Sequence, residues 1–160
     1  MRYQYNDGGR EAAGFKGSTR DCVVRAIAIA TGRGYSTVYD ELHKASKSYA
    51  AKRRDKVAKA IAKGGASPRD GVFKEVYKPY LEGLGWEWKP LMKIGSGCKV
   101  NMGRFYSWYL DQEDVPHEKV MILRLSKHLT AVVNGVIQDT HDPSRQGKRC
   151  VYGYYCKPQV

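Results

Sequence analysis

The stretch GSTRDCVVRAIAIA, residues 17–30, passes from small polar residues to an almost wholly apolar run. Asp21 is a residue type that caps helices, the apolar run extends from Val23 to Ala30, and Gly32 follows it. The stretch therefore predicts a buried helix with Cys22 in its first turn. A cysteine in that place is either a small core residue or a reactive thiol, because the free N–H groups at a helix N-terminus favour the thiolate.

A second informative stretch is HLTAVVNGVIQDTHD, residues 128–142, in which Asn134-Gly135 separates two runs rich in β-branched residues. Asn-Gly between such runs is the strongest short signal for a two-residue hairpin turn. The register that follows places Thr130 opposite Asp139. Because side chains alternate along a strand, His128 shares a face with Thr130 and lies one diagonal step from Asp139. The pattern predicts an imidazole beside an orienting carboxylate.

The other periodicities predict helices early in the chain and strands late. We expect helices from about residue 36 and over about 72–84, strands over 86–91, 120–125 and 149–156, and a turn at Gly95-Ser96-Gly97. Helices followed by an antiparallel sheet make an α+β domain. At 160 residues the chain fits one domain, 1–160, with a basic helical insertion at about 44–69.

The net charge is the outlier of the composition, because 28 Lys and Arg against 16 Asp and Glu give +12. A nucleic acid or an acidic protein is therefore an expected partner. The positive residues gather in the basic insertion, whose candidate nucleic-acid contacts are Lys52, Arg53, Arg54, Lys56 and Lys59. A solvated helix face is the commoner role of such a run, and this alternative stays open.

The four cysteines are widely separated, and the N-terminus opens no apolar leader. We expect reduced thiols, a cytoplasmic protein and no membrane span, since no stretch approaches the roughly 18 apolar residues that a span needs. Cys98, Cys150 and Cys156 are interpreted as packing residues, with a contact between Cys98 and Cys150 left open. Their spacing favours neither a zinc site nor any other metal site, and no cofactor is expected.

Cys22, His128 and Asp139 together can supply a nucleophile, a general base and acid, and an orienting carboxylate. The N–H groups of the predicted helix can also hold the oxyanion that forms when a thiolate attacks a carbonyl. Taken singly, a core cysteine, a structural histidine and a turn-flanking acid are the commoner interpretations. Their order along the chain and the hairpin register jointly favour a catalytic site.

The same order of residues resembles the papain-like cysteine peptidase superfamily, in which a cysteine opens an early helix and a histidine begins a later strand. More narrowly, DCVVRAIAIATG, RLSKHLTAVVNGVIQDTHDPSR and RCVYGYY resemble a family of mostly phage-encoded proteins with a Cys/His/Asp arrangement. The resemblance implies a helical part carrying Cys22, packed on an antiparallel sheet carrying His128 and Asp139. It also implies a protein or peptide substrate and, for a phage protein, the host-cell cytoplasm.

One departure from the superfamily pattern concerns the oxyanion hole. Papain-like peptidases commonly place a glutamine a few residues before the cysteine, whereas residues 16–21 are KGSTRD. Thr19, Ser18 or a backbone N–H group are the candidate replacements.

The sequence thus predicts a thiol hydrolase that cleaves a peptide, isopeptide or other amide bond through a thioester. Two alternatives remain. One is a noncatalytic nucleic-acid- or protein-binding module on the same fold, and the other is a cell-wall amidohydrolase whose positive charge aids approach to an anionic envelope.

Overall fold

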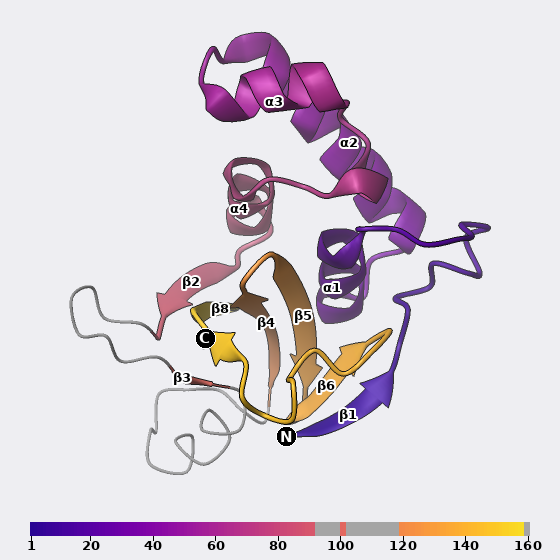
Figure 1. The fold of residues 1–160 in the computed structure, drawn as a ribbon, viewed down its shortest axis with the longest axis vertical. Coiled ribbons are helices and arrows are strands. Elements are labelled where there is room, and N and C mark those ends of the chain that lie inside the picture. Colours follow the sequence, from indigo (N-terminus) through magenta and orange to yellow (C-terminus); the bar gives the residue numbers. More distant parts are fainter. Residues whose placement is uncertain (92–99, 102–118, 159–160) are drawn as a thin grey trace.

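The computed structural model describes residues 1–91, 100–101 and 119–158. It has the predicted α+β composition, with the helices in the first half of the chain and most of the strands in the second (Figure 1). The helical elements are α1 (Cys22–Thr31), α2 (Tyr35–Lys52), α3 (Lys56–Gly64), η1 (Pro68–Asp70) and α4 (Lys74–Gly83). The strands are β1 (Arg2–Tyr5), β2 (Glu87–Pro90), β3 (Val100–Asn101), β4 (Val120–Leu125), β5 (His128–Val133), β6 (Val136–Asp139), β7 (Cys150–Val151) and β8 (Gly153–Cys156).

The main sheet has six strands in the order β1-β6-β5-β4-β8-β2. Strands β2, β4, β5, β6 and β8 pair in antiparallel fashion, but β1 runs parallel to β6, so the sheet is mixed rather than purely antiparallel. Strand β1 was not expected from the sequence, because all four of its residues are exposed and show no alternation of burial. Its pairing depends on a strand more than 130 residues later in the chain.

The β5–β6 hairpin forms as the Asn-Gly signal predicts. Asn134 and Gly135 both have positive φ angles, 50° and 72°, which a type I′ turn requires. Val133 then pairs with Val136, and Ala131 with Gln138. Strand β4 also begins and ends at the predicted residues. The sequence therefore predicted the centre of the sheet correctly.

The C-terminal strand differs from the prediction. Residues 149–156 form two short strands in separate sheets, β7 beside β3 and β8 between β4 and β2. The break lies at Tyr152, between β7 and β8. Gly153 then opens β8 at a close approach to β2, where an added Cβ would come within 2.5 Å of the Trp88 ring and of the Lys89 carbonyl oxygen. All four residues of β8 are buried, so no alternation is present. The turn predicted at Gly95-Ser96-Gly97 lies outside the described residues.

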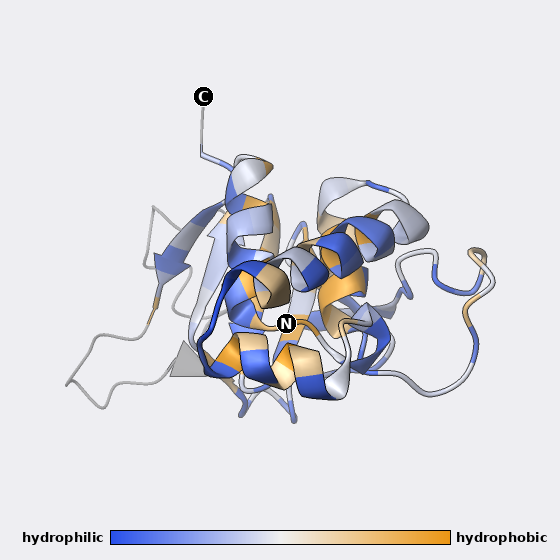
Figure 2. Cartoon of the chain, turned by 90° about the horizontal axis from the view of Figure 1, so that it is seen from above, coloured by the Kyte–Doolittle hydropathy of each residue, from blue (hydrophilic) through white to orange (hydrophobic). Residues whose placement is uncertain are grey.

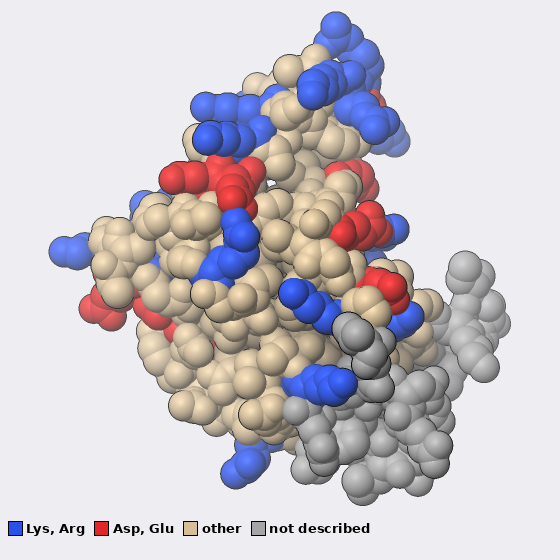
Figure 3. All heavy atoms as spheres, turned by 180° about the vertical axis from the view of Figure 1, so that it is seen from behind, with Lys and Arg blue, Asp and Glu red and all other residues tan. Residues whose placement is uncertain are grey.

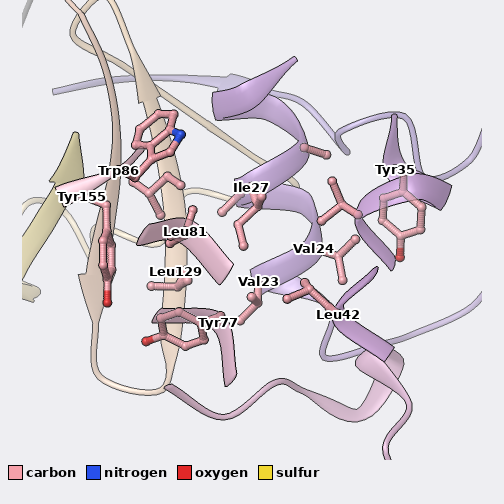
Figure 4. Close-up of a cluster of buried hydrophobic side chains, with 14 residues drawn as sticks. Val23, Val24, Ile27, Tyr35, Leu42, Tyr77, Leu81, Trp86, Leu129 and Tyr155 are labelled. Atoms are coloured by element: carbon pink, nitrogen blue, oxygen red, sulfur yellow. The ribbon is translucent and has the colours of Figure 1, made fainter. Parts of the chain in front are cut away.

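Helix α1 lies at the centre of the larger hydrophobic core. Val24 and Ile27 are fully buried between Leu42 of α2 on one side and the sheet residues Leu129 and Tyr155 on the other (Figure 4). Helix α4 adds Tyr77 and Leu81 to the same core, and Tyr80 and Leu84 are partly buried against it. Because α1 is anchored on both sides, the position of its first residue relative to the sheet is determined by packing.

Helix α3 packs against the C-terminal part of α2, at the end of the molecule far from the sheet (Figure 1). Both helices alternate hydrophilic and hydrophobic residues along their length (Figure 2), and α3 buries Ala58 and Ile61. Lys and Arg side chains gather over this end (Figure 3). We call this surface the α2–α3 basic patch; its residues are Lys44, Lys47, Lys52, Arg53, Arg54, Lys56, Lys59 and Lys63. No helix in the described part of the chain is long and apolar enough to cross a bilayer.

Candidate active site

Cys22 is the first residue of α1, as predicted, and is partly buried. Asp21, the residue before Cys22, was predicted to cap α1, but its side chain makes no cap hydrogen bond to the helix. The first-turn N–H groups of α1 are therefore not taken by that carboxylate. Cys22 and His128 both line a cleft of about 1330 Å³, whose walls come from the start of α1, the start of α4 and the strands β2, β4 and β5.

His128 and Asp139 are joined across the β5–β6 hairpin. The His128 Nε2 atom lies 2.7 Å from Asp139 Oδ2, although eleven residues separate the two along the chain. Asp139 is 3% exposed and stands behind the histidine rather than in the cleft lining. With Nε2 engaged by the carboxylate, Nδ1 is the ring nitrogen that remains for another partner. The predicted diagonal pair is thus present in the structure.

The imidazole of His128 also hydrogen-bonds the thiol of Cys22, and the backbone N–H of Leu129 donates a second hydrogen bond to the sulfur. Burial by itself would raise the pKa of Cys22, but the hydrogen bond and positive charge of His128 outweigh burial, and the pKa falls below its ordinary value. Cys22, His128 and Asp139 therefore form one continuous chain of contacts.

The pKa values of His128 and Asp139 shift in opposite directions. Burial opposes the charged form of His128, yet its hydrogen bonds to Asp139 and Cys22 raise its pKa to about 9. Burial likewise opposes the carboxylate of Asp139, but the hydrogen bond from His128 and its charge hold the pKa of Asp139 below its ordinary value. The three shifts favour the thiolate of Cys22, the imidazolium of His128 and the carboxylate of Asp139 over their neutral forms.

A buried cluster of charges, not predicted from the sequence, supports Asp139 on the side away from His128. The Arg25 guanidinium lies 3.4 Å from Asp139 Oδ1 and also forms an ion pair with the fully buried Asp21. Asp21 further accepts hydrogen bonds from the hydroxyl groups of Thr19 and Tyr35, each at 2.5 Å, and its Oδ2 lies 3.1 Å from the Nε atom of Arg10. The i, i+4 spacing of Asp21 and Arg25 was the available signal, but surface helices show the same spacing.

The two side chains proposed for the oxyanion hole have different surroundings. Thr19 lines the cleft, but its hydroxyl hydrogen is donated to Asp21 and is not available to an oxyanion. Ser18 is exposed and does not line the cleft. The backbone N–H groups at the start of α1 are therefore the better-placed donors, since they lie beside the Cys22 sulfur on the same turn.

The other predicted residues lie elsewhere. Cys150 and Cys156 belong to different sheets, and burial raises the pKa of the Cys156 thiol. Cys98 lies outside the described residues, so its predicted contact with Cys150 does too. Within the described ranges, no three His, Cys, Asp or Glu side chains gather in a way that holds a metal ion. The five candidate nucleic-acid contacts lie in the α2–α3 basic patch and do not line the cleft.

The cleft also contains residues that no sequence motif marks as functional. The His141 ring lies 5.4 Å from the ring of His128, centroid to centroid. Arg124 lies over two aromatic rings, 5.9 Å from the centroid of Trp88 and 5.7 Å from that of Tyr152. All of these residues line the cleft. They come from elements far apart in the sequence, and no short motif marks them.

Comparison of the chain with protein families, with curated proteins and with solved structures returned no match. The geometry of the site itself is therefore what bears on function.

Proposed function

We propose that the protein is a papain-like cysteine hydrolase that cleaves a peptide, isopeptide or other amide bond. The observation that supports this most directly is the continuous contact from Cys22 through His128 to Asp139, at the wall of a cleft. Packing alone does not require a core cysteine to contact an imidazole that is itself oriented by a buried carboxylate. The lowered pKa of Cys22 and the raised pKa of His128 agree with a thiolate–imidazolium pair.

The proposed reaction begins with attack of the Cys22 sulfur on the carbonyl carbon of the amide. The first-turn N–H groups of α1 donate to the oxyanion. His128 gives its proton to the leaving nitrogen as the C–N bond breaks, and an acyl thioester and a free amine result. Neutral His128 then takes a proton from water, the water oxygen attacks the thioester carbon, and the C–S bond breaks to restore the thiolate. Asp139 holds the imidazole in one orientation throughout.

The proposal is tested with a pooled library of fluorogenic peptide amides, with intact-mass spectrometry after rapid acid quench. Release of fluorophore and an acyl adduct on Cys22 are expected in the wild type, and neither is expected in Cys22→Ala. His128→Ala is expected to retain the fold and lose turnover. Turnover that persists in Cys22→Ala, or a wild type that neither turns over the library nor forms an adduct, overturns the proposal.

A second candidate function rests on a separate observation, the α2–α3 basic patch. Eight Lys and Arg residues project from one end of the molecule, and Asp55 is the only carboxylate within residues 44–69. Asp55 is already engaged as the N-cap of α3 and by the hydroxyl of Tyr49. The charge of the patch is suited to binding a polyanion. The second candidate function is therefore a noncatalytic module that binds a nucleic acid or an acidic protein through this patch, with no role for the cleft.

A further inference from the structure

The walls of the cleft carry an excess of positive charge. Lining residues include the cations Arg20 and Lys74 on the helical side and Arg124 and Lys127 on the sheet side, whereas Asp70 is the only carboxylate among the described lining residues. Within the described part of the chain, none of these four cations forms an ion pair. Arg20, Lys74 and Lys127 are exposed, and Arg124 is half-buried.

The catalytic cluster does not neutralise these cations, because it is balanced within itself. Cys22 and His128 carry no net charge as a pair, whether the shared proton lies on the sulfur or on the imidazole. The carboxylates of Asp139 and Asp21 are matched by Arg25 and by Arg10, which binds Asp21. Each buried charge in the cluster thus has a partner of opposite sign. The four wall cations are therefore available to a negatively charged ligand, and a cleft lined by charges of one sign focuses their field.

Arg124 is the most strongly preorganised of the four. Its guanidinium lies over the rings of Trp88 and Tyr152, and it also contacts the hydroxyl of Tyr77. These contacts limit the rotamers of a long side chain before any ligand binds, so less conformational entropy is lost on binding. A planar guanidinium held in this way presents paired N–H donors that match the two oxygens of a carboxylate.

We propose that the cleft binds an acidic polypeptide segment, with Glu or Asp side chains on both sides of the amide bond that Cys22 attacks. This inference rests on the proposed hydrolase function and adds the substrate class. Arg124 is the specificity-determining residue on the sheet side, and Lys74 and Arg20 meet carboxylates on the helical side. A peptide suits the site better than a nucleic acid, because a thiolate–imidazolium pair acts on an acyl carbon, which a phosphodiester backbone lacks.

The experiment measures binding to full-length Cys22→Ala by fluorescence anisotropy, so that turnover does not consume the probe. The probes are a fluorescein-labelled peptide with Glu on both sides of a central Gly-Gly, its twin with every Glu replaced by Gln, and oligothymidylate. The acidic peptide is expected to bind at least about tenfold more tightly than its twin, and to weaken as salt is raised. Arg124→Gln is expected to remove most of that preference, and Arg124→Lys to restore it in part, since it keeps the charge and loses the paired donors.

Lys63→Gln is the matched control, because it removes a cation from the α2–α3 basic patch at a site away from the cleft lining. It is expected to leave peptide affinity unchanged. If Arg124→Gln does not fold, the salt dependence and the Glu-to-Gln comparison on the parent protein decide the question. Equal affinity for the two peptides, or oligothymidylate competing more strongly than the acidic peptide, overturns the inference. Turnover of any amide by Cys22 tests the hydrolase proposal separately, so the two failures are distinguishable.

Discussion

The Arg25 guanidinium lies 3.4 Å from Asp139 Oδ1, on the oxygen that His128 leaves free. His128 takes Oδ2, and the backbone N–H of Thr140 donates to Oδ1 at 2.7 Å, so both carboxylate oxygens are held. Arg25 is on α1, one turn after Cys22, and Asp139 is on β6. The helix that carries Cys22, the proposed nucleophile, is thus tied directly to Asp139, the residue that hydrogen-bonds the proposed base.

Arg25→Met is expected to lower turnover roughly tenfold with little change in KM, because Asp139 loses a contact that fixes its orientation. A tenfold loss of rate corresponds to ~1.4 kcal/mol of transition-state stabilisation. The variant should also be less stable by about 3 kcal/mol, since Asp21 is left buried with fewer partners. Steady-state kinetics and urea denaturation measure the two effects. Arg10→Gln is the control: it removes a partner of Asp21 without touching Asp139, so stability should fall while turnover holds.

Cys22 is expected to react with iodoacetamide faster at pH 7 than the other cysteines, because only the thiolate reacts and the contact with His128 lowers the pKa of Cys22. Burial raises the pKa of Cys156, which should therefore label slowly. Peptide mapping by mass spectrometry gives the rate at each cysteine. His128→Ala removes the largest contribution that offsets burial and leaves the smaller ones from the Leu129 N–H and Arg25, so the pKa of Cys22 should rise and its labelling rate fall severalfold. Four equal labelling rates in the folded protein would contradict this assignment.

The pH profile of turnover should be limited on the alkaline side near pH 9, where His128, whose pKa is raised to about 9, loses the proton that it gives to the leaving amine. On the acid side turnover should fall as Cys22 becomes protonated, below the ordinary thiol pKa of 9.0. Asp139→Asn removes the negative charge that stabilises the imidazolium, so the pKa of His128 drops and the alkaline limb moves to lower pH. An alkaline limb at the same pH in the wild type and in Asp139→Asn would count against the role of Asp139.

The α2–α3 basic patch is expected to bind nucleic acid weakly and with a steep salt dependence, because each neutralised phosphate releases condensed counterions. Replacing the five residues Lys52, Arg53, Arg54, Lys56 and Lys59 with Ser should abolish retention in a low-salt gel shift. Iodoacetamide labelling of Cys22 should be unchanged in that variant, since the patch does not line the cleft. If the parent protein retains neither single- nor double-stranded nucleic acid, an acidic protein becomes the preferred partner for the patch.

The sequence alone determined those features that depend on neighbouring residues. Asn134-Gly135 adopts positive φ angles at little cost and so specifies the turn, and the turn specifies the β5–β6 register that brings His128 to Asp139. The apolar run after Cys22 and the left-handed Gly32 at its end likewise specify the limits of α1. Local backbone preference and side-chain periodicity are sufficient for both features.

Only the tertiary structure decided how these parts meet. Cys22 reaches His128 because α1 is clamped between α2 and the sheet, and that packing joins residues more than a hundred positions apart. Asp21 was expected to cap α1, but Arg25, Arg10, Tyr35 and Thr19 surround it, and burial among these four donors outweighs a cap hydrogen bond. The parallel pairing of β1 and the splitting of the C-terminal strand at Tyr152 follow from contacts of the same long range, which local propensity does not encode.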